Sequence, residues 1–297
     1  MDFSTYLHAV GTGRKGNRDL SFDEAKDMMK QMLAQEATAP QVAAFLLGWR
    51  LKPETTEEFC GALECCDEFV SHSHVENSIE LGYPFDGKRR NPYLFPLVAR
   101  YLSPFGVKLV VVGDKLQPAK GGITTKEVYS NVETDKNLRF FDRKEYCYAM
   151  HKLTEVRNSL GLRTALNTIE KLPNVAQSKV ALTGVFHKPY VKKYIEIFAK
   201  RYETFGVIQG NEGTPEVFSK SRVWVAKNGK VQEYMVEPRD FGVEYKKSWE
   251  DILLEESIEQ LVNPTKEFVQ LAKFNAALYL FVAGVTNSLE SGLEQIG

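Results

Sequence analysis

Residues 81–92 have the sequence LGYPFDGKRRNP and lie where a strand pattern changes to a helical pattern. The apolar residues before Gly87 are typical of the end of a buried strand, and from position 94 onward apolar residues recur at helical spacing. In an open α/β sheet, ligands bind in the crevice beyond the carboxyl ends of the strands. Backbone N–H groups at a helix start favour anions, and Lys88, Arg89 and Arg90 add positive charge there. We therefore expect this loop to bind an anion, either a phosphate or a nucleic-acid backbone.

Helix-start signals upstream of this loop predict a small helical domain. A capping box at Ser21 precedes one apolar helical pattern, and another capping box at Thr55 precedes a second. Between them, Thr38 begins a third pattern, with Pro two residues later. We therefore expect three short helices in a domain that comprises residues 1–73.

The pattern changes after His74 to short apolar segments rich in Val and Ile, at residues 79–83, 107–112, 179–182 and 206–209. Helical patterns separate these segments, which is typical of βαβ units with a mainly parallel sheet. Asn228 and Gly229 lie between two later segments and predict a hairpin. A final helix at residues 264–285 should pack on this sheet. The fold class is α/β: we expect residues 74–297 to form a mainly parallel sheet flanked by helices, with hinge segments that can return to the helical domain.

Composition excludes several classes of protein. The chain has 297 residues, which is enough for two domains, and its 43% hydrophobic and 26% charged residues are ordinary for a soluble globular protein. Four Cys, of which Cys65 and Cys66 are adjacent, form neither a disulfide framework nor a zinc pattern. No signal segment or 18-residue apolar run is present, so we expect a cytoplasmic protein without a membrane contact.

The formal net charge of −1 gives no global attraction to a polyanion. Any nucleic-acid binding would therefore need positive charge gathered on one face. A first basic cluster lies in the glycine-rich residues 11–18, which lack the flanking strand of a dinucleotide-binding motif and alone predict a solvated N-terminal loop. This cluster becomes relevant if the fold brings it near residues 81–92.

Several separated segments resemble the anthranilate phosphoribosyltransferase and nucleoside phosphorylase fold family. Residues 44–55, AFLLGWRLKPET, fall in the helical part of the match, and residues 156–164, VRNSLGLRT, are similar to that family's Val-Arg-x-x-Leu-Gly-x-Arg-Thr segment. The resemblance covers nearly the whole chain. It implies a small helical domain joined to an α/β domain with a substrate cleft between them, and commonly a homodimer formed through the helical domains.

The chain departs from this family where family enzymes bind their substrate. A Gly-Thr-Gly-Gly-Asp loop holds phosphoribosyl pyrophosphate in the family, whereas residues 85–90 read FDGKRR and retain only Gly87. The family's Mg²⁺-binding Asp-Glu pair corresponds to residues 210–216, GNEGTPE, where Pro215 takes the Asp position. The family's Lys-His-Gly-Asn-Arg loop appears here as residues 112–116, VGDKL.

These departures resemble a subgroup, the YbiB-type relatives of the transferase, which are similar to nucleic-acid-binding dimers without a demonstrated transferase role. The resemblance therefore implies a non-catalytic or catalytically degenerate protein that binds DNA or RNA largely without sequence preference and needs no cofactor. The candidate contacts are the basic loops and their neighbours: Arg14, Lys15, Arg18, Gly87, Lys88, Arg89, Arg90, Asn91, Lys188, Lys192 and Lys193.

The alternative is a phosphoribosyl (glycosyl) transferase with altered loops. The basic loop would then grip pyrophosphate by side chains, with Glu212 and Glu216 holding Mg²⁺. Arg157 matches a family position that contacts the aromatic acceptor, although an Arg on a helix is commonly a surface or ion-pair residue. The sequence leaves open the choice between DNA and RNA, any residual transfer activity, and whether the basic loops share one groove.

Overall fold

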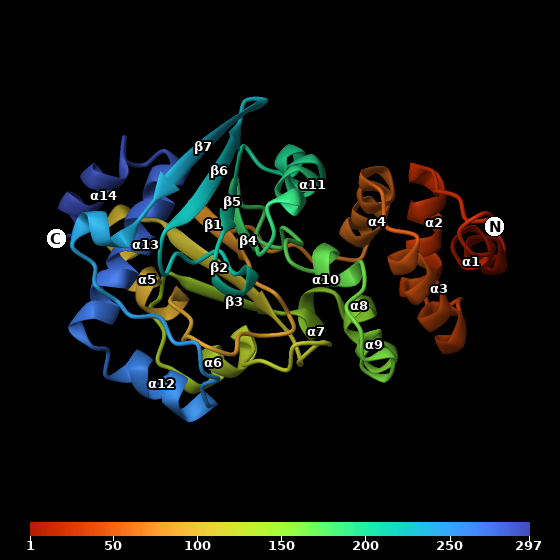
Figure 1. Cartoon of the computed structure of the whole chain (residues 1–297), viewed down its shortest axis with the longest axis horizontal. Helices are drawn as coiled ribbons and strands as arrows, with labels where there is room; N and C mark the ends of the chain where they lie inside the picture. Colours follow the sequence, from red (N-terminus) through yellow and green to blue (C-terminus); the bar gives the residue numbers. More distant parts are fainter.

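The computed structural model describes residues 1–297, and its N-terminal domain is a bundle of four helices (Figure 1). They are α1 (Phe3–Gly11), α2 (Phe22–Leu33), α3 (Ala39–Leu51) and α4 (Thr56–Glu68). The capping boxes predicted at Ser21 and Thr55 are both confirmed. Helix α1 was not expected, because its buried face is short and the glycines that follow it suggested a loop. Residues 12–21, which include the basic Arg14, Lys15 and Arg18, connect α1 to α2.

The larger domain contains one seven-stranded sheet in the order β3-β2-β1-β4-β5-β6-β7. The strands are β1 (Ser78–Gly82), β2 (Lys108–Gly113), β3 (Leu138–Asp142), β4 (Val180–Val185), β5 (Thr204–Gln209), β6 (Ser221–Lys227) and β7 (Lys230–Val236). The first five are parallel, and β6 and β7 add the antiparallel hairpin predicted at Asn228. The mainly parallel α/β fold is therefore confirmed, and β3 is the strand that the sequence did not indicate.

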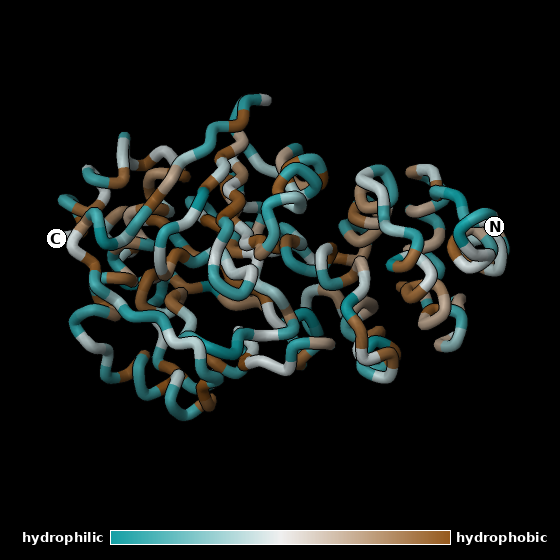
Figure 2. Tube along the Cα trace, in the orientation of Figure 1, coloured by the Kyte–Doolittle hydropathy of each residue, from teal (hydrophilic) through white to brown (hydrophobic).

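Both faces of the central strands are buried, whereas the edge strand β7 is largely exposed. In β2, Val110 and Val112 belong to a core shared with the helical domain, while Leu109 and Val111 belong to a second core on the opposite face. Figure 2 shows the same arrangement, with hydrophobic residues along the central strands and hydrophilic residues in the peripheral loops.

Helices cover the two faces as separate groups (Figure 1). One group is α5 (Phe95–Leu102), α6 (Thr125–Asn131), α12 (Leu254–Val262), α13 (Lys266–Ala283) and α14 (Leu289–Ile296). The other is α7 (Arg143–Tyr146), α8 (Tyr148–Lys152), α9 (Thr154–Leu160), α10 (Leu166–Ile169) and α11 (Pro189–Phe198). Helix α13 packs on α5 and the sheet as expected, and its buried Asn275 hydrogen-bonds to both backbone groups of Val217. None of the helices has the length and apolar character that crossing a membrane requires.

The second group of helices joins the two domains. Helix α9 packs against α3, and α10 and α11 pack against α4, so the chain returns to the helical domain after crossing to the sheet. Two ion-paired or hydrogen-bonded contacts reinforce this junction: Arg201 pairs with Asp67 at 2.6 Å, and the Thr56 hydroxyl donates to Glu196 at 2.9 Å. One hydrophobic core therefore extends from α1 to the sheet, and this packing fixes the two walls of the space between the domains.

Candidate functional site

A cleft of about 740 Å³ lies between the helical domain and the carboxyl ends of β1, β4 and β5. Pro84 follows β1, Phe186 follows β4 and Glu212 follows β5, and all three line the cleft. In the strand order 3-2-1-4-5 the direction of chain progression reverses between β1 and β4. Ligands of open α/β sheets bind at this switch point. The position and the volume are those of a ligand site.

Positive charge dominates the walls of this cleft. Seven cationic side chains line it, whereas only three carboxylates do. The cations are Arg50, Arg89, Arg90, Lys120, Arg163, Lys171 and Lys193, and the carboxylates are Glu54, Glu212 and Asp251. Burial raises the pKa of the Glu54 carboxyl, which further favours its uncharged form. The near-neutral chain therefore has a local excess of positive charge in this cleft.

Several of these cations are held by backbone carbonyls. The Lys171 ammonium donates to Gly184 O at 2.9 Å, the Lys193 ammonium donates to Glu54 O at 2.7 Å, and Arg50 donates to Arg163 O. A carbonyl orients a cation and does not cancel its charge. These three groups come from α3, from the residues that follow α10 and from α11, and none of them has a carboxylate partner.

Three of the four remaining cations have carboxylate partners, and Arg90 has none. Arg89 pairs with Asp251, and Arg163 pairs with Asp86 at 2.7 Å. Lys120 lies 3.8 Å from Asp86, and burial lowers the pKa of its ammonium. The buried Asp86 carboxylate thus lies between the Arg163 and Lys120 side chains. Its Oδ1 atom has no hydrogen-bond partner.

Within the β1–α5 loop, the N–H groups from Gly87 to Arg90 are bound inside the protein and are not free for a ligand. Gly87 N donates to Pro84 O, and Lys88 N donates to Ile123 O at 2.9 Å. The next two N–H groups, those of Arg89 and Arg90, both donate to the Glu212 carboxylate, at 2.6 and 3.2 Å. A carboxylate of the protein therefore occupies the position where this loop would hold an external anion.

The expectation that Lys88 contacts a phosphate is corrected by the structure. Its side chain is fully buried, and its ammonium donates to Glu216 and to Pro92 O at 2.8 Å. The rings of Tyr93 and Phe218 lie over the ammonium at 5.2 and 4.2 Å. Desolvation lowers the pKa of Lys88, although the Glu216 charge opposes this effect. Lys88 is a structural cation, and Arg89 and Arg90 are the exposed members of this triplet.

The expected metal ligands do not fit a Mg²⁺ ion. The Glu216 carboxylate is fully buried and accepts from Lys88, from the Tyr83 hydroxyl at 2.9 Å and from Leu94 N at 2.6 Å. Glu212 is bound to the N–H groups described above. Because Lys88 supplies the positive charge beside Glu216, a divalent ion would have to displace a buried ammonium. Nowhere in the chain do three or more His, Cys, Asp or Glu residues gather as a metal-binding group.

Arg157 does not line the cleft as an acceptor contact would. Its guanidinium is fully buried and donates to both oxygens of Glu170, at 2.5 and 2.8 Å. Glu170 also binds Arg143, which in turn donates to Asp114 at 2.6 Å. Two cations and two carboxylates balance in this buried network, which connects α9 and α10 to the sheet. Arg157 is therefore an ion-pair residue, one of the alternatives that its helical position left open.

The remaining predicted contacts are spread over several places. Arg14, Lys15 and Arg18 lie on the α1–α2 connection outside the cleft wall, and Arg18 pairs with Glu24 at 2.6 Å. Lys188 and Lys192 are exposed and also lie outside the wall, whereas Lys193 lines it. Arg89 and Arg90 of the central loop therefore line the same cleft as Lys193 of α11. The N-terminal basic loop does not line it.

Gly87 and Asn91 have structural roles within the same loop. Gly87 has a φ of +80°, and a Cβ atom there would meet Gly122 O at 2.3 Å. The buried Asn91 side chain binds both backbone groups of Ser248, accepting from its N at 2.9 Å and donating to its O at 3.3 Å. These two residues set the path of the loop and of the segment that follows Ser248.

Four cleft cations were not among the predicted residues: Arg50, Lys120, Arg163 and Lys171. Arg50 and Arg163 fall within the two segments that carried the family resemblance, at residues 44–55 and 156–164. The family resemblance of those two segments could therefore have identified both arginines as candidate site residues. Lys120 and Lys171 are isolated lysines in the sequence, and no local pattern distinguishes them from surface residues.

Comparisons with known proteins agree with this architecture. A family model described as "Glycosyl transferase family, helical bundle domain" matches residues 4–69, and one described as "Glycosyl transferase family, a/b domain" matches residues 114–297. An uncharacterized protein of Aquifex aeolicus is 31% identical over 94% of this chain and 93% of its own length. The anthranilate phosphoribosyltransferase of Neisseria meningitidis serogroup C is 25% identical over 93% of this chain and 86% of its own length.

Solved structures show the same fold. The anthranilate phosphoribosyltransferase of Thermus thermophilus superposes with a TM-score of 0.77 at 20% identity, covering 100% of this chain and 93% of its own. That of Saccharomyces cerevisiae, in complex with PRPP and Mg, has a TM-score of 0.77 at 16% identity, covering 99% of this chain and 92% of its own.

Proposed function

Since this chain belongs to the glycosyl transferase family of the anthranilate phosphoribosyltransferase type, we propose that it is a member without transferase activity that binds nucleic acid in its cleft. Binding is largely independent of base sequence, because the cations of the cleft contact phosphates rather than base edges. The observation that carries this proposal is the state of the β1–α5 loop. All four N–H groups from Gly87 to Arg90 are bound within the protein, while the Arg89 and Arg90 side chains are exposed.

This state supports binding by side chains over binding by backbone. A diphosphate cradle requires free N–H groups and a close approach of the main chain. Here the Glu212 carboxylate accepts the hydrogen bond from Arg89 N, and the Lys88 ammonium neutralises the Glu216 carboxylate. Long cationic side chains on the rim can instead contact successive phosphates of a polymer and release its counterions.

A salt titration of oligonucleotide binding tests the proposal. The informative variant is Arg50→Gln/Lys193→Gln, because both side chains line the cleft and neither has a carboxylate partner that would be left unpaired. The wild type should lose affinity steeply between 50 and 200 mM salt, and the double variant should bind more weakly with a shallower slope. Each lost phosphate contact lowers the log–log slope by about 0.7 to 0.9.

The matched control is Lys30→Gln/Lys136→Gln, which removes two exposed charges outside the cleft wall. It should reproduce both the affinity and the slope of the wild type. A flat salt response, or an equal effect of the two double variants, would contradict the proposal.

Phosphoribosyl transfer is the second candidate, and the cleft supports it by its position at the sheet switch point and its ligand-sized volume. The structural relative from Saccharomyces cerevisiae is in complex with PRPP and Mg. A ligand that binds only the folded state must raise the melting temperature. We expect phosphoribosyl pyrophosphate with Mg²⁺ to give no rise beyond that of Mg²⁺ alone, and a clear metal-dependent rise would favour this second candidate.

Homodimer formation through the helical domain, which the family resemblance implies, stays a prediction. Light scattering of the purified protein should give twice the chain mass of 33.7 kDa. A cytoplasmic location likewise stays a prediction from the sequence.

A further inference from the structure

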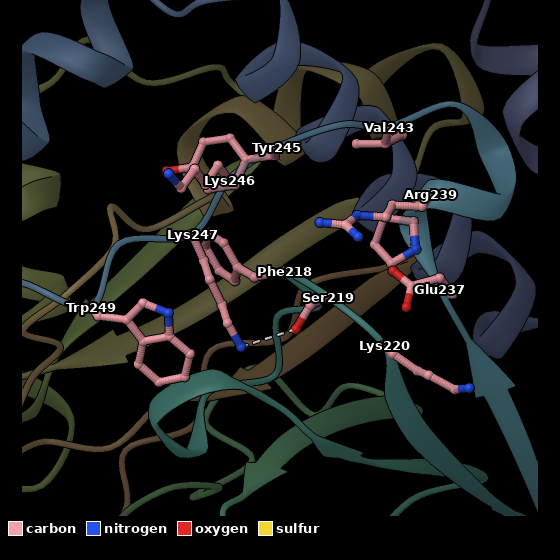
Figure 3. A pocket seen from close by; sticks show the side chains of 11 residues that line it. Phe218, Ser219, Lys220, Glu237, Arg239, Val243, Tyr245, Lys246, Lys247 and Trp249 are labelled. Carbon is pink, nitrogen blue, oxygen red and sulfur yellow. Dashed lines mark hydrogen bonds between the residues drawn. The ribbon is translucent and has the colours of Figure 1, made fainter.

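A second basic depression has a volume of about 290 Å³ (Figure 3). Its wall combines the residues that follow β7 with the segment 243–249 and with the residues that precede β6. Four cations line it, Lys220, Arg239, Lys246 and Lys247, against the single carboxylate Glu237. None of the four cations forms an ion pair, and Lys247 donates only to the Ser219 hydroxyl, at 3.2 Å. This depression is therefore a separate region of unneutralised positive charge.

Trp249 stands between this depression and the cleft. The Lys247 ammonium lies 4.5 Å from the centre of its ring, and the Arg90 guanidinium of the cleft lies 5.8 Å from the same ring. The Trp249 side chain is 67% exposed, whereas Trp49 and Trp224 are buried. Figure 3 shows the indole beside the Lys247 side chain at the edge of the depression. One exposed aromatic surface thus connects two basic regions.

The segment that carries Trp249 is fastened to the cleft loop. Asn91 binds both backbone groups of Ser248, and Ile252 N donates to Arg89 O at 2.8 Å. These bonds lie on either side of Trp249 in the chain. The backbone that carries the indole is consequently positioned in the free protein, which reduces the entropy lost when a ligand stacks on it.

We propose that Trp249 is a stacking platform for an unpaired base, and that the second depression holds the phosphates next to that base. This inference rests on the proposed function and deepens it, because it names single-stranded nucleic acid as the substrate class. A duplex keeps the faces of its bases inside the stack, so only an unpaired base can place its face on an exposed indole. Aromatic platforms flanked by cations are the common solution for single strands, and they tolerate any base.

Trp249→Ala separates this inference from general phosphate binding. With an oligothymidylate of about 16 nucleotides, the variant should bind about 5- to 150-fold more weakly than the wild type, as expected for the loss of one stacked base. Trp249→Phe, which keeps an aromatic ring, should retain most of the affinity. For a duplex of the same length, the affinity of Trp249→Ala should stay within about twofold of the wild type, because no unpaired base is lost.

Tyr148→Ala is the matched control. Tyr148 is also an exposed aromatic residue with a lysine ammonium near its ring, Lys152 at 5.5 Å, but it lines neither cavity. This variant should bind both probes as the wild type does. Lys220→Gln/Lys246→Gln should in addition lower the salt slope for the oligothymidylate, because it removes two phosphate contacts from the depression.

The outcomes distinguish this inference from the proposed function. If Arg50→Gln/Lys193→Gln weakens binding but Trp249→Ala binds oligothymidylate as the wild type does, the stacking platform is overturned and the proposed function stands. If Trp249→Ala weakens duplex and single strand equally, the assignment to single strands is overturned. If the wild type binds neither probe at low salt, both proposals fail.

Discussion

At the scale of single residues, neighbours in the sequence have opposite environments. Lys88 is fully buried and forms an ion pair with Glu216, while the Arg89 side chain is 48% exposed at the rim of the cleft. The difference comes from partners far along the chain, because Glu216 lies 128 residues from Lys88. A basic triplet therefore does not act as one unit, and variants of residues 88–90 made together would mix folding with binding.

Glu80 is a buried carboxyl on the central strand β1. It accepts hydrogen bonds from the Tyr202 hydroxyl at 2.7 Å and from Asn174 N at 3.1 Å. Desolvation by burial raises the pKa of Glu80 to about 7, although these hydrogen bonds oppose the effect. Burial in the folded protein thus disfavours the charged form of Glu80.

Glu80 should make stability depend on pH in a defined window. The unfolded chain releases this proton near pH 4.5 and the folded protein near pH 7, so the folded state binds more protons between these values. Its contribution to the free energy of unfolding should therefore fall by about 3 kcal/mol as pH rises through the window, and then stay constant. Urea unfolding of wild type and Glu80→Gln at several pH values measures this difference.

The difference between Glu80→Gln and wild type isolates Glu80, since the other groups titrate in both proteins. The exposed Glu76, four residues earlier, provides the control variant Glu76→Gln, which should keep the wild-type pH dependence. Parallel pH profiles for all three proteins would show that Glu80 is ionised normally in the folded state.

At the scale of elements, two loops at the carboxyl edge of the sheet are fastened to each other. The β1–α5 loop contributes Lys88 and the N–H groups of Arg89 and Arg90, and the β5–β6 connection contributes Glu212 and Glu216. Glu216 also accepts from Leu94 N at the start of α5. The rim of the cleft is therefore rigid where it presents its arginines.

Lys88→Met should cost about 3 to 5 kcal/mol of stability, because it leaves the Glu216 carboxylate buried without its counterion. Adding Glu216→Gln should recover much of this loss, since the amide oxygen can still accept hydrogen bonds and the buried charge is gone. Urea unfolding of the two single variants and the double variant measures this coupling as a double-mutant cycle.

Arg89→Met is the control for this cycle, because the Arg89 ion pair with Asp251 is about half exposed. Such a surface pair contributes about 0 to 1 kcal/mol. A cost of Lys88→Met no larger than that of Arg89→Met would contradict a structural role of the buried ammonium.

At the scale of the whole molecule, charge is segregated. The chain has a net charge of −1 and a calculated pI near 6.6, yet seven cations line one cleft and four more line the second depression. Within a Debye length of about 8 Å, a polyanion responds to these local charges more than to the total. The net charge of the chain alone therefore does not predict whether the protein binds a polyanion.

Binding of a single-stranded oligonucleotide should accordingly change little between pH 7 and pH 8, by about twofold or less, because Arg and Lys ionise well above this range. The protein as a whole is negative throughout this range. Fluorescence anisotropy at constant ionic strength measures the affinity, and raising the salt at constant pH provides the positive control. A steep loss of affinity over this pH range would show that the total charge, and not the cleft, controls binding.

The predictions that succeeded depend on patterns only a few residues long. Capping boxes at Ser21 and Thr55 begin helices, and Asn228-Gly229 forms the hairpin turn. The Val-rich segment of β2 is buried on both faces as expected for a central parallel strand. Helix α1 and strand β3 were missed because one precedes a glycine-rich loop and the other is an edge strand with partly exposed residues.

The sequence by itself determined most of the elements and the α/β class, because caps, turns and hydrophobic periods act between residues that are close in the chain. Only the tertiary structure decided which charges face the cleft. Lys88 is neutralised by Glu216 and Arg157 by Glu170, whereas Arg50, Lys171 and Lys193 are bound to carbonyls and keep their charge free for a ligand. The physical reason is that the charge a site presents depends on which opposite charges the fold brings within a few ångströms, and those partners come from distant segments.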